Sequence, residues 1–309
     1  INGAYDLTIN TADALTLTGA IGASTALDSV NISTTSGNLT LGANITVSGT
    51  GTDAMIFNAG SDTAAGTATG GNIIISGSPT LTTGTGGRIT FYTGSISGST
   101  GLTSLIGSGT HRFRYNSDES DTNYSAALSS GQYAIYREQP TLTITADDET
   151  VTYGTAPAES VTITGMQNGD SSATVVTTAA SISIAGDTST SGNYTVGDHT
   201  ITPSAAASTY GYAFSYATGT LTVNNQAITI TGITAANKVY DSNTTATIDV
   251  DSIGGYIEGD DLSISAITGT FGQEHIGTGI AVSFSAITYA GDDVNNYTIT
   301  DQAGTTANI

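Results

Sequence analysis

Residues 36–49, SGNLTLGANITVSG, decide how the first part of the chain folds. They hold two short segments, 39–41 (LTL) and 45–47 (ITV), in which apolar residues alternate with threonine. Successive side chains of a β-strand point to opposite faces of the sheet, so each segment has one face to bury and one face for water. The stretch therefore predicts two short, half-buried strands, and the glycine and asparagine between them predict a turn.

The same alternating pattern recurs along residues 1–100 with a regular spacing. Leu7, Val30 and Met55 lie 23 and 25 residues apart, and Leu15 and Leu39 lie 24 apart. A repeat of this length with three short strands per cycle fits one coil of a parallel β-helix, whose coils pair with those above and below. An antiparallel sandwich is less favoured, because the gaps contain few two-residue Asn-Gly or Asp-Gly turns. We therefore predict an N-terminal right-handed parallel β-helix.

Beyond residue 103 the chain becomes bulky, aromatic and charged. Residues 111–115 read HRFRY, and an acidic loop follows them. Because the last coil of a β-helix would expose strand edges and apolar core, we predict that these residues form a cap in which the arginines pair with neighbouring acids. The alternative is that Arg112, Arg114 and Tyr115 form a stacking and hydrogen-bonding platform for a sugar.

Two similar units follow Pro140. Their shared landmarks, in order, are LTIT and ITIT, VTYG and KVYD, NGD and EGD, NYT and NYT, and a threonine-containing closing segment. Tyr153 and Tyr240, in the second landmark, lie 87 residues apart, and a unit of that size suits a small β-domain. We predict an internal duplication and an all-β chain divided into residues 1–138 (β-helix with cap), 139–225 and 226–309 (two tandem small β-rich domains).

These landmarks resemble repeats of large bacterial surface adhesins. The run ITGITAANKVYDSNTTATI, with EGD, HIGTGIAV and DDVNNYTIT, resembles the YDG repeat, with Ser242 at the usual glycine. VTYGTAP, MQNGD, GNYTV and GTLTVNN resemble the MBG repeat, and SGNLTLGANITVSG is similar to the shafts of filamentous-haemagglutinin-like exoproteins exported by two-partner secretion. The resemblance implies an extracellular, cell-surface fibrous adhesin active in cell adhesion or biofilm formation, in which this segment supplies a rigid shaft and spacer domains.

Charge and hydropathy narrow the range of partners. A net charge of −21 disfavours a phosphate-binding face, so we expect no nucleic acid partner. No apolar run approaches the roughly 20 residues that span a bilayer, so we expect no membrane insertion. The expected partners are other copies, which could build a filament, or neighbouring segments of the same fibre; surface glycans are the alternative. Because the chain opens with Ile1 rather than Met, we interpret it as an internal piece of a longer or processed protein.

The sequence does not indicate an enzyme. Its three histidines fall one in each predicted segment, and none lies in a nucleophile or phosphate-binding motif. The enzymatic alternative is a β-helical polysaccharide-degrading enzyme, which would need acids and bases clustered on one face of the coils. Residues 1–100 carry only five scattered aspartates and Arg88. We therefore expect no catalytic residues.

Calcium is the cofactor that the sequence raises. Asp118, Asp121 and Asn123, with Glu119, form the densest local set of oxygen ligands. They lack the glycine and the distal glutamate of an EF-hand loop. We expect no cofactor, with calcium at these residues as the alternative, and interpret the acids as solubilising.

The sole lysine, Lys238, stands close in sequence to Asp241 and Asn243. These are the residue types of an intramolecular Lys–Asn isopeptide bond, which needs a desolvated lysine beside an acid and an amide. The unit before it has VTYG at the same landmark, with neither lysine nor aspartate. We therefore favour an exposed lysine and interpret the stretch as a folding landmark.

Overall fold

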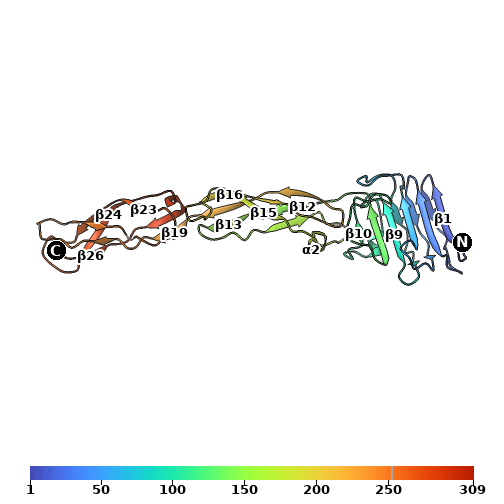
Figure 1. The fold of residues 1–309 in the computed structure, drawn as a ribbon, viewed down its shortest axis with the longest axis horizontal. Helices are drawn as coiled ribbons and strands as arrows, with labels where there is room; N and C mark the ends of the chain where they lie inside the picture. The colour runs from blue at the N-terminus through green and yellow to red at the C-terminus, as the bar shows by residue number, and fades with distance from the viewer. Residues whose placement is uncertain (252) are drawn as a thin grey trace. The chain divides into compact units, whose positions relative to one another are not determined.

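The computed structural model describes residues 1–251 and 253–309, and its elements are mostly strands (Figure 1). The helices in the described residues are α1 (Leu102–Ile106), α2 (Ser172–Val175) and the 3-10 turn η1 (Val294–Asn296). The all-β class predicted from the alternation is confirmed. The chain forms two compact units: the first contains Ile1–Thr145, Thr162–Ser181 and Pro203–Ala217, and the second contains Ala146–Val161, Ile182–Thr202 and Thr218–Ile309.

Parallel strands dominate the N-terminal part of the first unit, residues 1–138, which we call the N-terminal stack. Its largest sheet has the order β1 (Asp6–Thr11), β3 (Ser29–Thr34), β6 (Met55–Ala59), β9 (Arg88–Thr93), β11 (Gly131–Tyr136) and β10 (Phe113–Arg114), and every neighbouring pair is parallel. Leu7 pairs with Val30, and Val30 pairs with Met55. The spacing read from the sequence is therefore the length of the first two circuits of the chain. The next circuits are longer than predicted, since Met55 pairs with Ile89 and Ile89 pairs with Gln132.

Two smaller parallel sheets complete the stack. One contains β2 (Leu15–Leu17), β4 (Leu39–Leu41) and β7 (Ile73–Ile75), and the other contains β5 (Ile45–Thr46) and β8 (Leu81–Thr82). Leu15 pairs with Leu39, as the repeat predicts. The inward-facing residues of all three sheets form one apolar core, in which the Phe57 ring stacks on the Phe91 ring with centroids 5.4 Å apart. Similar side chains stack on one another in successive circuits, so each circuit packs against the circuits above and below it.

Asparagines between the strands hold successive circuits together. The side-chain oxygen of Asn38 accepts a hydrogen bond from the backbone N–H of Asn72 (3.0 Å), and that of Asn72 accepts one from Ser95 (2.7 Å). Asn44 accepts in the same way from Thr80 (2.8 Å). Backbone groups at the corners leave the strand ladders, so these amides satisfy donors that would otherwise lack a partner.

Residues 139–309 form short mixed sheets. Two sheets lie before Gln226. One contains, in order, β14 (Val161–Thr164), β12 (Thr141–Ala146) and β17 (Ala213–Ala217). The other contains β13 (Glu149–Thr152), β18 (Gly219–Asn224), β16 (Gly197–Ser204) and β15 (Ser181–Ala185). Three sheets are formed by the strands from Gln226 onward. The first pairs β19 (Gln226–Thr229) with β25 (Tyr297–Thr300), and the second pairs β20 (Thr234–Ala235) with β22 (Ile248–Asp249). The third contains, in order, β21 (Thr245–Ala246), β23 (Ser263–Phe271), β24 (Ile280–Ala290) and β26 (Thr305–Ala307).

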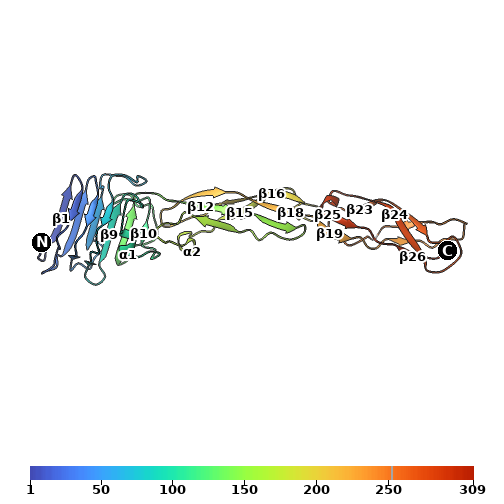
Figure 2. The same cartoon turned by 180° about the vertical axis from the view of Figure 1, so that it is seen from behind.

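Strand pairing in these sheets repeats once along the chain. β12 pairs in parallel with β17. β19 pairs in parallel with β25, and both are labelled in Figure 2. The closing strand of each repeat, β18 or β26, pairs antiparallel with a long hairpin strand, β16 or β24. The recurrence agrees with the predicted duplication, but one landmark was matched wrongly. Leu142 pairs with Phe214 and Ile228 pairs with Ile299, so Tyr297 corresponds to Tyr212 and not to Tyr194 of the first NYT segment. No helix among the described residues has the length and apolar character needed to cross a membrane.

Candidate functional site

Each compact unit contains one buried cluster in which two tyrosines share one aspartate. The aspartates, Asp170 and Asp260, end the sequences GMQNGD and GYIEGD. The first glycine of each sequence has a positive φ (93° and 104°), and a Cβ there would lie 2.2 and 2.1 Å from a carbonyl oxygen of β12 and β19. Only glycine fits that approach, so the turn that presents the aspartate is fixed by the backbone.

In the first unit, the carboxylate of Asp170 accepts hydrogen bonds from the hydroxyls of Tyr115 and Tyr212, each 3.0 Å from the same oxygen. The Tyr212 hydroxyl also accepts from the backbone N–H of Gln167 (3.0 Å), and the Tyr115 hydroxyl accepts from the side-chain amide of Asn168 (3.1 Å). The two rings contact each other with centroids 4.6 Å apart. We call Tyr115, Asp170 and Tyr212 the first clasp.

In the second unit, Asp260 is bonded by Tyr153 and Tyr297. The Tyr153 hydroxyl donates to one carboxylate oxygen at 2.6 Å, and the Tyr297 hydroxyl donates to the same oxygen. The Tyr297 hydroxyl accepts from the backbone N–H of Ile257 (3.1 Å), and the two rings meet edge to face with centroids 5.3 Å apart. We call Tyr153, Asp260 and Tyr297 the second clasp.

The two clasps have the same construction. In each, the backbone N–H three residues before the aspartate donates to the hydroxyl of a tyrosine that follows the turn, Tyr212 or Tyr297. The other tyrosine, Tyr115 or Tyr153, comes from earlier in the chain, 55 and 107 residues before the aspartate. Each clasp therefore joins one segment of the chain to the segment that follows it.

The two aspartates differ in their electrostatics. Burial raises the pKa of Asp170, and the hydrogen bonds from Tyr212 and Tyr115 reduce this shift without reversing it. His111 lies beside it, with Nδ1 3.6 Å from the second carboxylate oxygen. The pKa of Asp260 is lowered, because the hydroxyls of Ser191, Tyr153 and Tyr297 outweigh the effect of burial.

The tyrosines of both clasps remain hydrogen-bond donors. Burial is the main cause that raises the pKa of each of them, and the nearby carboxylate adds to it. A hydroxyl that keeps its proton and faces an acceptor-only carboxylate makes a strong, charge-assisted hydrogen bond. Both donors meet one oxygen within the protein, so the arrangement is suited to holding two segments together.

Comparison with family models identifies two known domains among the segments that these clasps join. Residues 142–222 match the MBG domain (YGX type), and residues 224–306 match the YDG domain. The chain carries an MBG domain followed by a YDG domain. No match to the chain was found among curated proteins or among solved structures. The order of the two domains, predicted from their motifs, is confirmed.

The MBG domain takes part in both clasps. It supplies Asp170 and Tyr212 to the first, where Tyr115 belongs to the N-terminal stack, and Tyr153 to the second, where the YDG domain supplies Asp260 and Tyr297. Tyr153 is followed by Gly154 and agrees with the YGX pattern of the MBG description. The tyrosine of that pattern is fully buried in the second clasp.

Two of the three residues predicted to bind a ligand are inaccessible. Tyr115 is fully buried in the first clasp, and Arg114 is 3% exposed. The Arg114 guanidinium donates to the carbonyl oxygen of Ala126 (3.0 Å) and lies over the Tyr210 ring, 4.6 Å from its centroid. These two side chains fill the capping layer and leave no free face for a sugar.

Arg112, the third predicted ligand-binding residue, is half-buried. It donates to the carbonyl oxygen of Ser130 (2.8 Å) and lies over the Tyr133 ring, 5.1 Å from its centroid. In the described part of the chain neither Arg112 nor Arg114 has an acid within 4.0 Å, so the predicted pairing of these arginines with neighbouring acids is wrong. Loop carbonyls at the end of the stack lack strand partners, and the guanidinium groups satisfy them instead.

The predicted calcium residues are engaged in a local turn. Asp118 accepts hydrogen bonds from the backbone N–H groups of Ser120 (2.7 Å), Asp121 (2.6 Å) and Ala65 (2.8 Å). Burial opposes ionisation, but these bonds outweigh it and lower the pKa of Asp118. The Asn123 amide donates to a backbone carbonyl at 2.6 Å. Within residues 1–251 and 253–309, no group of three or more acidic or histidine side chains is placed to hold a metal ion.

Lys238 is held inside a loop of the YDG domain. Its ammonium pairs with Asp241 (2.7 Å) and donates to the carbonyl and side-chain oxygens of Asn243, each at 2.9 Å. The side chain is 15% exposed, so the expectation of an exposed lysine is wrong. Ser242 has a φ of 59°, a left-handed conformation in which glycine is preferred. The lysine offsets that strain by joining both sides of the turn.

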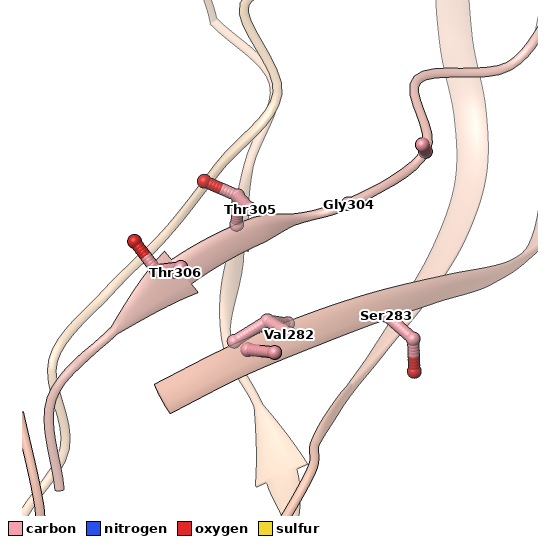
Figure 3. A pocket seen from close by; sticks show the side chains of 7 residues that line it. Val282, Ser283, Gly304, Thr305 and Thr306 are labelled. Atoms are coloured by element: carbon pink, nitrogen blue, oxygen red, sulfur yellow. The ribbon is translucent and has the colours of Figure 1, made fainter. Parts of the chain in front are cut away.

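A shallow groove opens beside β24 and β26 of the YDG domain (Figure 3). Its volume is about 540 Å³, and its walls are Ala281, Val282, Ser283, Ala303, Gly304, Thr305 and Thr306. These side chains are small and carry no titratable group. The groove therefore supplies hydroxyl and apolar contacts without an acid or a base.

The sequence marked the clasp residues without revealing their role. NGD and EGD are shared landmarks of the two units, and Tyr153 and Tyr240 stand at a second shared landmark of the sequence. A signal was present, because both units carry the same Gly-x-x-x-Gly-Asp turn followed by a tyrosine. The partner tyrosine of each clasp lies at a different distance along the chain, so spacing could not identify it.

Proposed function

We propose that this chain is a structural and adhesive segment of an extracellular bacterial surface protein of the filamentous-haemagglutinin-like, two-partner-secreted type. The N-terminal stack is the end of a right-handed parallel β-helical shaft, and the MBG and YDG domains are spacers after it. The segment contributes to attachment and biofilm formation by holding neighbouring parts of a fibre in place. It carries no catalytic activity and no cofactor.

The repeated clasp is the observation that carries this proposal. Each domain boundary is crossed by a tyrosine that bonds a buried aspartate of the next domain. A recurring joint of this kind suits a protein whose task is to transmit position or load along the chain. Small domains with short connections are otherwise free to move independently.

The stack supports the same role through its open edge. Among the strands that the structure describes, β1 lies at the end of its sheet and pairs with β3 alone. Leu7 and Ile9 on β1 are packed against the core from one side. An unpaired parallel edge of this kind accepts a further coil, either from a neighbouring segment of the same fibre or from another copy.

Attachment by the organism that makes the protein tests the proposal. We expect antibodies against the purified 309-residue chain to label intact cells. We also expect deletion of the codons for these residues, in frame, to reduce attachment to surfaces and biofilm mass. Absence of surface labelling, or full attachment after the deletion, would overturn the proposal.

Two matched variants distinguish a structural role of the segment from a local sugar-binding role. Asp260→Ala breaks the second clasp and leaves Arg112 unchanged, whereas Arg112→Ala leaves both clasps intact. A structural role predicts that Asp260→Ala weakens attachment more than Arg112→Ala does. The reverse order would favour a sugar-binding role.

A further inference from the structure

The dipeptide Asn-Gly occurs twice in the sequence, as Asn2 with Gly3 and as Asn168 with Gly169. An asparagine in this context is open to spontaneous deamidation, because glycine has no Cβ to obstruct its backbone nitrogen. That nitrogen forms a bond to the side-chain amide carbon of the asparagine. The bond from this carbon to Nδ2 breaks, and Nδ2 leaves as ammonia with the proton that the backbone nitrogen gives up. Water then opens the resulting succinimide ring to an aspartate or an isoaspartate.

Asn168 lies in the joint between the N-terminal stack and the MBG domain. Its Oδ1 accepts a hydrogen bond from the Thr103 hydroxyl (2.6 Å), and its Nδ2 donates one to the Tyr115 hydroxyl (3.1 Å). Its backbone carbonyl accepts one from the Gly109 N–H (3.0 Å). All three partners belong to the stack, so the stack holds both ends of the side-chain amide and the backbone beside it.

These contacts oppose deamidation while the joint is closed. Ring closure needs the amide carbon to turn towards the Gly169 nitrogen, and the departure of Nδ2 removes the bond to Tyr115 altogether. The bond from Thr103 to Oδ1 restrains the same rotation at the other end of the amide. The backbone is confined as well, because a Cβ on Gly169 would lie 2.0 Å from Ser108 Oγ. A reaction that first breaks two hydrogen bonds is slower than one in which the amide faces water.

The product would not fit the closed joint. A carboxylate at position 168 would offer only acceptor oxygens to the Tyr115 hydroxyl, whose proton is already donated to Asp170. It would also bring a second negative charge to the hydroxyl that binds Asp170, whose pKa burial already raises. An isoaspartate would lengthen the backbone in a turn where Ser108 leaves no space. After deamidation the first clasp therefore cannot close in its present form.

The second joint has the same turn without the amide. Glu258 stands at the position of Asn168, since the two sequences are GMQNGD and GYIEGD. A glutamate has no amide nitrogen to lose. The two joints therefore differ in this one reaction, although in both an aspartate receives two tyrosine hydroxyls.

We propose that Asn168 is a site of spontaneous deamidation that the closed first clasp protects, and that reaction there, once the joint has opened, prevents the clasp from closing again. Opening of the first joint thus becomes irreversible with time, whereas the second joint can open and close repeatedly. This property goes beyond the proposed structural role, because it depends on the time that the joint spends open.

The rate of deamidation at Asn168 tests the proposal. The 309-residue chain is held in mildly alkaline buffer, both folded and in denaturant, and is then digested at acidic pH, where deamidation is slow. Peptide mass spectrometry gives the fraction of Asn168 converted at each time. We expect conversion to be roughly tenfold slower in the folded chain than in denaturant, because two hydrogen bonds must break first.

Three matched variants assign the protection to particular contacts. Tyr115→Phe removes the hydroxyl that binds Nδ2 and Asp170, and Thr103→Val removes the donor to Oδ1 while leaving the first clasp intact. Both should raise the rate in the folded chain towards the rate in denaturant. Tyr153→Phe removes the equivalent hydroxyl of the second clasp and should leave the rate at Asn168 unchanged. Asn2, the other Asn-Gly site, is the internal reference, and circular dichroism shows that each variant is folded.

Asn168→Asp tests whether the joint stays open. Amide hydrogen exchange should become faster at Gly109 and Tyr115, whose N–H groups bond Asn168 and Tyr210, and should not change at Ile257 of the second clasp. Equal conversion of Asn168 in the folded and denatured chains would overturn the proposal. A rate that neither Tyr115→Phe nor Thr103→Val raises would overturn it too, as would unchanged exchange in Asn168→Asp.

Discussion

Tyr153 of the MBG domain donates a hydrogen bond to Asp260 of the YDG domain at 2.6 Å, and both residues are buried. Tyr115 and Asp170 stand in the same relationship one domain earlier. A buried acceptor with two donors is costly to disturb, because removing it leaves both hydroxyls without a partner. The joints between the segments are therefore open to direct test.

Asp260→Ala should lower the free energy of unfolding of the YDG domain by about 2–3 kcal/mol, since two buried tyrosine hydroxyls lose their acceptor. Denaturant unfolding followed by tyrosine fluorescence and circular dichroism measures this change. Glu274→Ala is the matched control, because Glu274 is exposed in a loop of the same domain. Equal stability of the two variants would contradict the role of Asp260.

Tyr153→Phe should cost about 1 kcal/mol, because the ring stays packed and only one hydrogen bond is lost. Tyr5→Phe, at an exposed position, should leave stability unchanged. Combining Tyr153→Phe with Asp260→Ala should cost less than the sum of the two single changes. Additive effects in that double-mutant cycle would show that the two groups do not interact.

The two clasps should respond to acid in opposite directions. The lowered pKa of Asp260 means that its stabilising contribution is present above pH 3.8, the ordinary aspartate value, and is lost as the pH falls through its folded-state pKa. The raised pKa of Asp170 means that its contribution is present below pH 3.8 and is lost as the pH rises through its folded-state pKa.

Unfolding measured at several pH values from about 6 down to 3 tests this difference. Relative to the unmodified chain, Asp260→Asn should lose less stability on acidification. Asp170→Asn should lose more, because it removes a group that favours the folded state in acid. The same pH dependence in both variants would contradict the assignment.

Gly255→Ala should destabilise the YDG domain by about 2 kcal/mol or more, because the position has a positive φ and no room for a side chain. The added Cβ would lie 2.1 Å from the carbonyl oxygen of Thr229. Gly51→Ala is the control, since a Cβ there meets nothing within 4 Å. Thermal unfolding of the two variants, compared by circular dichroism, should show a lower midpoint for Gly255→Ala alone.

The Lys238 loop should contain no covalent crosslink. Lys238 is ion-paired with Asp241, and the hydrogen bond from the lysine lowers the pKa of that carboxyl. The amine is held against the Asp241 carboxylate, whereas attack on the Asn243 amide would need an amine free of that ion pair. Intact mass spectrometry should give the mass of the sequence, and a mass lower by one ammonia would contradict this.

Much of the strand framework was predictable because it follows local periodicity. Leu7 pairs with Val30 and Val30 pairs with Met55, at a spacing visible in the sequence, so apolar residues stack in register. The cap was also predictable as a change from small to bulky residues. What failed was the choice of partners there, because Arg114 bonds loop carbonyls whose positions depend on the whole stack.

The sequence by itself determined the all-β class, the length of the first two circuits of the stack, and the MBG and YDG domains, since these depend on alternation and on short motifs. Only the tertiary structure decided that Tyr115 meets Asp170, that Tyr153 meets Asp260, and that Tyr240 meets solvent. These outcomes depend on contacts between residues far apart in the chain. Motif spacing within one domain carries no information about which side chain the next domain will cover.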